Sequence, residues 1–206
     1  MLKVLITGSG RCGTTSIAKY LDGLQFNSEE TIISQHETDA GKIIRYLIDG
    51  RIDEINKTML GFKNNIEVSP YIALFPSRPL GNVQLISLIR DGRKTVISGF
   101  NTGWFENIDD EKYHWSNYVN KLFDGERFTK CCQLWTYVYN KLERWNSSFY
   151  RLEDISKYTK IREKFLDQMN IKRSNKPIEV LNQAKKQKKR ISEKLAEHIE
   201  NWGGTS

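Results

Sequence analysis

The sequence predicts an α/β fold in which a mainly parallel sheet carries helices on both faces. Three observations support this. Short apolar runs alternate with amphipathic helical patterns, a glycine-rich loop joins the first strand to the first helix, and residues 83–89 form an almost unbroken apolar run, as a strand buried on both faces would. Right-handed crossovers place the strand-to-helix loops along one edge of such a sheet, where ligands bind.

The chain opens with the order strand, loop, helix. Residues 2–6 form a short apolar run with β-branched members, which Gly8-Ser9-Gly10 ends. From Thr14 to Leu24 the apolar side chains recur at helical spacing, so a helix should follow the loop. Further strands are expected at residues 66–69, where Pro70 follows, at 83–89 and at 148–152.

Two more segments, Phe128–Trp145 and Leu181–Trp202, have helical spacing. We also expect a helix that follows Arg90-Asp91-Gly92-Arg93 and runs through Phe100, and another over residues 155–169. The polar and aromatic stretch 101–127 shows no clear period and is a candidate cover for a site. Since no repeat or linker interrupts the chain, we expect a single domain over residues 1–206.

Composition limits the class of protein. Hydrophobic residues make up 38% of the 206 residues, and no run approaches the roughly 20 apolar residues of a membrane span. The three cysteines, Cys12, Cys131 and Cys132, have neither metal-binding spacing nor the pattern of a disulfide framework. We therefore expect no metal site and a reducing, cytoplasmic setting.

The charge balance points to an anionic partner. The net charge is +7, and the run Lys185–Arg190 contains five positive charges and no negative one. A basic excess favours a nucleotide, a nucleic acid or an acidic surface as partner. The run itself has a plainer interpretation as the solvated face of a helix.

Residues 8–15 nearly match the phosphate-loop pattern G-x-x-x-x-G-K-[ST]. Glycines let backbone N–H groups turn toward an anion, and the following helix adds donors at its N-terminus. Thr14 stands where a nucleoside triphosphatase carries the lysine that steadies the β- and γ-phosphates, which argues against ATP or GTP hydrolysis. Arg11 instead places a cation inside the loop. The alternative is an ordinary tight turn between strand and helix.

Two motifs resemble those of one family. Residues 10–15 resemble the 5′-phosphosulfate loop of the sulfotransferases that use 3′-phosphoadenosine 5′-phosphosulfate (PAPS), whose core is [K/R]-x-G-T-T. Residues 88–98 resemble the family's 3′-phosphate motif, in which an arginine ends a strand and a serine follows eight residues later. Arg90 and Ser98 match that spacing, and Arg90-Asp91-Gly92-Arg93 is closest to the tyrosylprotein and related bacterial branches.

Two shorter segments add to the resemblance. Leu152-Glu153-Asp154-Ile155 resembles the family's Y-E-D-L segment, with leucine in place of tyrosine, and Glu67-Val68-Ser69-Pro70 recurs in bacterial relatives. Together these motifs span about residues 3–155. The resemblance implies a P-loop-NTPase-like sulfotransferase fold, and transfer of a sulfuryl group from PAPS to a hydroxyl or amine acceptor with release of 3′-phosphoadenosine 5′-phosphate (PAP).

The resemblance also implies which residues bind the donor: Arg11, Cys12, Gly13, Thr14, Thr15, Ser16, Arg90 and Ser98. PAPS has two anionic ends. The loop suits the 5′-phosphosulfate, and the guanidinium of Arg90, with the hydroxyl of Ser98, suits the 3′-phosphate. Arg11 would also be catalytic by stabilising charge near the bridging oxygen. For Arg90 the alternative is an ion pair with a neighbour.

An acceptor hydroxyl also needs a general base. Cytosolic members of the family use a strand histidine, which residues 66–69 lack, whereas other branches use a glutamate shortly after the first helix. One bacterial pattern, G-L-x-[IV]-G-H-E, points to Glu29, and the tyrosylprotein pattern G-E-E-T points to Glu30. We expect one of these two to be the base, with preference for Glu30. His36-Glu37 and Glu67 are further candidates.

Two other functions are compatible with parts of the sequence. A P-loop small-molecule or nucleotide kinase would use Asp91 as a magnesium ligand but would need a lysine at Thr14. A non-catalytic nucleic-acid-binding protein would use the positive charge and the many aromatic residues, without a phosphate loop. For a sulfotransferase the acceptor stays open among small molecules, carbohydrates and peptides, and the sequence does not indicate an oligomeric state.

Overall fold

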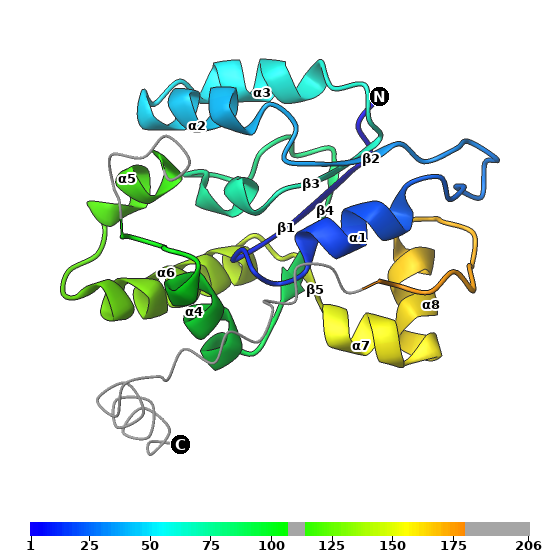
Figure 1. Cartoon of the computed structure of the whole chain (residues 1–206). Coiled ribbons are helices and arrows are strands. Elements are labelled where there is room, and N and C mark those ends of the chain that lie inside the picture. Colours follow the sequence, from blue (N-terminus) through cyan, green and yellow to red (C-terminus); the bar gives the residue numbers. More distant parts are fainter. Residues whose placement is uncertain (107–113, 180–206) are drawn as a thin grey trace.

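A five-stranded parallel sheet lies at the centre of the computed structural model, which describes residues 1–106 and 114–179. The strands are β1 (Val4–Gly8), β2 (Ser34–His36), β3 (Ile66–Val68), β4 (Gln84–Ile89) and β5 (Ser148–Arg151). Their order is β2-β3-β1-β4-β5, and each neighbouring pair runs parallel (Figure 1). The predicted α/β class with a parallel sheet is therefore confirmed.

Helices cover both faces of the sheet, because alternate side chains of each strand point to opposite faces. On one face Val4 and Ile6 share a core with α1 (Thr14–Leu21), α7 (Leu152–Lys157) and α8 (Thr159–Gln168). On the other, Leu5 and Leu85 share a core with α2 (Ala40–Ile48), α3 (Ile52–Leu60), the 3₁₀ helix η1 (Pro70–Leu74), α4 (Gly92–Asn101), α5 (His114–Asn120) and α6 (Arg127–Arg144).

Several element boundaries differ from the prediction. The first helix ends at Leu21 rather than Leu24, because Asp22 is extended and Gly23 has a φ of +78°. The single helix expected over residues 155–169 is two helices, α7 and α8, with the extended residue Tyr158 between them. The elements β2, α2 and α3 were not predicted. Each is short, and α3 buries only Ile55 and Met59, so its periodic signal is weak.

Two predictions cannot be compared with the structure. The expected helix Leu181–Trp202 and the basic run Lys185–Arg190 lie outside the described residues. Within residues 1–106 and 114–179, no helix is both long enough and apolar enough to cross a membrane.

Trp104, in the stretch proposed as a cover, packs onto the glycine-rich loop. A Cβ on Gly10 of the loop would lie 3.1 Å from the Trp104 ring, and a Cβ on Gly99 of α4 would lie 2.2 Å from it. The ring contacts Trp115 edge to face at 5.4 Å between centroids, and Arg127 Nε donates a 2.7 Å hydrogen bond to the Trp104 carbonyl. Trp104 thus connects α4, α5 and α6 with the loop.

We expect Gly99→Ala to destabilise the protein by about 1–3 kcal/mol, because its Cβ would overlap the buried indole of Trp104. Gly41→Ala is the matched control: no atom lies within 4 Å of its added Cβ, and the change should be neutral or stabilise by up to about 1 kcal/mol. Urea unfolding at equilibrium measures both changes. Equal midpoints for the two variants would show that Trp104 does not pack tightly on α4.

Candidate functional site

The parallel sheet brings five loops to one edge, because the carboxyl ends of all its strands point the same way. The glycine-rich loop follows β1, and Arg90 follows the neighbouring strand β4. Glu37 follows β2, Ser69 follows β3, and Leu152 follows β5. Residues far apart in the sequence thus meet at this carboxyl edge.

The loop from Ser9 to Gly13 is shaped for an anion. Arg11 and Gly13 have positive φ angles of 53° and 99°, and Gly13 caps α1 without a side-chain hydrogen bond. Left-handed backbone followed by a helix N-terminus directs N–H groups toward one point. The loop is also closely packed: a Cβ on Gly8 would lie 2.3 Å from the Leu88 carbonyl oxygen, and one on Gly13 would lie 2.4 Å from Leu152.

The structure brings Arg11, Arg90 and Ser98 together. Arg11 Nε donates a 3.0 Å hydrogen bond to Ser98 Oγ, and Arg90 Nη1 donates a 3.1 Å bond to the Arg11 carbonyl oxygen. Burial and the neighbouring charge of Arg90 lower the pKa of Arg11. The charge of Arg90 acts on the guanidinium of Arg11 in a partly desolvated place, and an anion bound between the two side chains would stabilise both charges.

Arg90 also forms an ion pair, as the alternative interpretation suggested. Its Nε lies 3.3 Å from Glu153 Oε1, and the two side chains are 32% and 50% exposed. Glu153 belongs to the segment that resembles Y-E-D-L. The carboxylate therefore balances part of the positive charge at the site and leaves the rest on Arg11 and Arg90.

The remaining predicted donor-binding residues lie at the start of α1. His36 Nε2, at the end of β2, lies 3.0 Å from Thr14 Oγ1 and 3.4 Å from Thr15 Oγ1. Burial lowers the pKa of His36, so its ring is neutral at pH 7 and can orient both hydroxyls. Ser16 is buried on α1.

Cys12 is a space-filling residue of the loop. Its thiol is buried, and burial raises its pKa to about 12, so the group stays protonated at neutral pH. A Cβ on Gly8 would lie 2.5 Å from the Cys12 sulfur, which shows how closely the thiol packs under the loop. A reactive thiolate is therefore not favoured at this position.

Glu29 and Glu30 do not lie at the carboxyl edge, so the geometry does not favour either of them as the base. Glu30 forms an ion pair with Lys3, just before β1, and accepts a 3.2 Å hydrogen bond from Asn65, just before β3. Glu29 pairs with Lys172. Since β1 has five residues, it separates Glu30 from the loop by about 13–17 Å, whereas proton transfer needs about 3 Å.

The physical reason is the direction of α1. Because α1 packs back along β1, its C-terminal end returns to the amino edge of the sheet, and the chain reaches the carboxyl edge again only at the end of β2. Glu37 occupies that place. Its backbone N–H donates a 3.2 Å bond to the Val68 carbonyl oxygen, and its Oε1 lies 3.8 Å from His36 Nε2.

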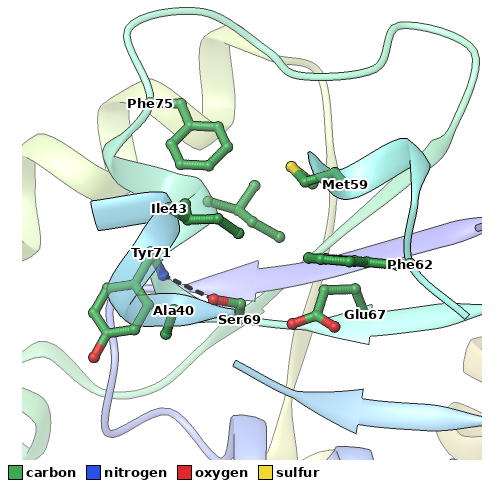
Figure 2. A pocket seen from close by; sticks show the side chains of 9 residues that line it. Ala40, Ile43, Met59, Phe62, Glu67, Ser69, Tyr71 and Phe75 are labelled. Carbon is green, nitrogen blue, oxygen red and sulfur yellow. Dashed lines mark hydrogen bonds between the residues drawn. The ribbon is translucent and has the colours of Figure 1, made fainter. Parts of the chain in front are cut away.

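Glu37 and Glu67 form a carboxylate pair beside the loop. Burial and then the charge of Glu67 raise the pKa of Glu37, and burial raises that of Glu67, which is only 1% exposed. The pKa of Tyr71 is raised by burial and by the Glu37 charge, so this phenol is also near. Figure 2 shows Glu67 and Ser69 at one wall of a narrow pocket whose other walls are apolar, formed by Ile43, Met59, Phe62 and Phe75.

Comparison of the chain with protein-family models and with curated protein sequences finds no match. The functional interpretation therefore rests on the residues and their geometry. Of the candidates named from the sequence, Arg11, Arg90, Ser98 and Glu37 lie at the carboxyl edge, Glu67 lies within β3, and Glu29 and Glu30 lie at the amino edge.

Proposed function

We propose that this chain is a sulfotransferase that moves a sulfuryl group from PAPS to a hydroxyl or amine acceptor, with PAP as the second product. The observation that carries the proposal is the joining of Arg11, Arg90 and Ser98 around a phosphate-type loop that has Thr14 in place of lysine. Such a site has two cations for a donor with two anionic ends but lacks the group that steadies a triphosphate. In this proposal the parallel sheet is that of the P-loop-like sulfotransferases.

The donor would lie across the ends of β1 and β4. Backbone N–H groups of the loop and the hydroxyls of Thr14 and Thr15 would hold the 5′-phosphosulfate, while Arg90 and Ser98 would hold the 3′-phosphate. Arg11, which donates to Ser98 Oγ in the free protein, would turn its remaining N–H groups toward the bridging oxygen. Charge that develops on this oxygen as the S–O bond breaks would be stabilised there.

Glu37 is the general base in this proposal, in place of Glu29 or Glu30. A bond forms between the acceptor oxygen or nitrogen and sulfur, the bond from sulfur to the bridging oxygen breaks, and the acceptor proton passes to the Glu37 carboxylate. Its raised pKa makes Glu37 a stronger base than a solvated glutamate. This role is supported by His36, the preceding residue, which contacts Thr14 at the start of α1 and whose Nε2 lies 3.8 Å from Glu37 Oε1.

The kinase alternative has less support from the geometry. It requires Asp91 as a magnesium ligand, but the Asp91 carboxylate caps α4 by accepting a 3.1 Å hydrogen bond from the Lys94 N–H, and it lies 3.5 Å from Arg93. These contacts account for its position without a metal. A nucleic-acid-binding protein would have no use for the joined arginines inside a closely packed loop.

We expect Arg90→Ala to weaken PAP binding at least tenfold, because a charge-assisted hydrogen bond to phosphate contributes about 1.5–3 kcal/mol. Binding of adenosine 5′-phosphosulfate, which lacks the 3′-phosphate, should change much less. Arg93→Ala, which removes an exposed arginine three residues away, should leave both affinities unchanged. Isothermal titration calorimetry measures them. Equal losses for the two nucleotides in Arg90→Ala would mean that Arg90 does not bind the 3′-phosphate.

We expect Glu37→Gln to lower kcat by about 10²–10⁴-fold, because glutamine keeps the size of the side chain but cannot accept a proton. The affinity for PAP should stay within a few-fold of the original. Transfer from sulfur-labelled PAPS, first screened over hydroxyl and amine acceptors, measures this. Glu29→Gln and Glu30→Gln are the controls and should keep near-normal turnover; loss of turnover in either, with Glu37→Gln active, would return the base to the segment after α1.

A further inference from the structure

Glu67 is a carboxylate inside the sheet. It lies in the middle of β3, is 1% exposed, and pairs in register with Leu5 of β1 and Gln35 of β2. A carboxylate is rarely retained at such a place, because burial disfavours its charged form. Its neighbours in the pocket of Figure 2 are mainly apolar, so packing alone would be satisfied by leucine or methionine.

The Glu67 carboxylate holds the turn that carries Glu37. Its Oε1 accepts a 3.0 Å hydrogen bond from the Thr38 N–H, and its Oε2 accepts a 2.8 Å bond from Asn64 Nδ2. The residues on either side of Thr38 are in the left-handed region, with φ angles of 59° at Glu37 and 53° at Asp39. Residues other than glycine keep such angles only where surrounding contacts impose them.

We propose that Glu67 is a positioning residue for Glu37, which holds the Glu37–Asp39 turn through the Thr38 N–H and sets a negative charge beneath the base. This inference rests on the proposed function only because it calls Glu37 a base. The hydrogen bond from the Thr38 N–H to Glu67, which clamps the turn, is a property of the folded chain. Glu67 itself is too buried to meet an acceptor.

The effect of the Glu67 charge on the pKa of Glu37 also depends on the other titratable groups that face Glu37. Those that face it are His36 on β2, Glu67 on β3 and Tyr71 on η1. His36 is neutral at pH 7 because burial lowers its pKa, and burial and Glu37 keep the phenol of Tyr71 protonated. The hydrogen bonds from Thr38 and Asn64 favour the ionised form of Glu67 and so oppose the burial that raises its pKa, and the Glu67 charge in turn raises the pKa of Glu37.

The direction in which loss of the Glu67 charge should shift the pH profile follows from the pKa of Glu37. Glu37 has its pKa raised by burial and by the Glu67 charge. Removing that charge while keeping the hydrogen-bond acceptor should lower the Glu37 pKa toward its ordinary range. Since a general base is active above its pKa, the acid limb of the pH profile should move to lower pH. Removing the acceptor as well should release the turn.

Two substitutions separate these effects. In Glu67→Gln, the amide oxygen still accepts from Thr38, so kcat should stay within a few-fold while the Glu37 carboxyl titrates at lower pH. In Glu67→Leu, the clamp is lost, so kcat should fall at least tenfold with PAP affinity unchanged. Glu54→Gln, an exposed change on α3 where Glu54 pairs with Lys57, is the control and should alter neither quantity.

The titration of Glu37 is followed by NMR of protein with ¹³C-labelled glutamate carboxyls, assigned with Glu37→Gln, and needs no acceptor. An unchanged Glu37 titration in Glu67→Gln would overturn the inference, as would a folded Glu67→Leu protein with full kcat. If Glu67→Leu does not fold, the Glu67→Gln titration alone decides. Failure of the proposed function would instead appear as absence of PAP binding to the unaltered protein, whatever the Glu37 titration shows.

Discussion

The rest of the site depends on two guanidinium groups, Arg11 and Arg90, being held together at the ends of adjacent strands. The fold achieves this because β1 and β4 are parallel neighbours, so the residues that follow them meet at one edge. The 3.1 Å hydrogen bond from Arg90 to the Arg11 carbonyl oxygen then joins the two loops. Like charges repel, and burial around Arg11 adds to the cost of its charge, which supports the proposal that this site binds an anion.

The residues around Arg11 and Arg90 are closely packed and leave little room for movement. The backbone of the loop approaches the Leu88 carbonyl so closely at Gly8 that no side chain fits, and the Trp104 ring lies on Gly10. On the other side, His36 contacts the hydroxyl of Thr14 and so fixes the end of β2 against the start of α1. The base proposed here, Glu37, is the next residue, and its position therefore depends on the same contacts that shape the anion site.

The sequence predicts which residues surround the glycine-rich loop better than it predicts which carboxylate lies near that loop. Residues 8–15 and 83–98 carry strong local signals, an apolar strand followed by glycine or arginine, and the structure brings Arg11, Arg90 and Ser98 together as expected. The position of Glu29 and Glu30 could not be foreseen because of β2, which has three residues and no apolar run. Without that strand, the segment after α1 could not be assigned to an edge of the sheet. The sequence signal for this strand and its end was the apolar pair Ile32-Ile33, followed by His36-Glu37.

The central claim is that the site binds a 3′-phosphorylated adenosine nucleotide rather than a nucleoside triphosphate. Calorimetric titration of the full chain with PAP, with ATP and magnesium, and with single-stranded DNA tests it most directly. The account predicts a micromolar Kd for PAP, and a stabilisation of about 2.7 kcal/mol at a hundredfold excess of free PAP over its Kd. Neither ATP with magnesium nor the DNA should bind at similar concentrations. Binding of ATP with magnesium, or of DNA, without binding of PAP would contradict the account.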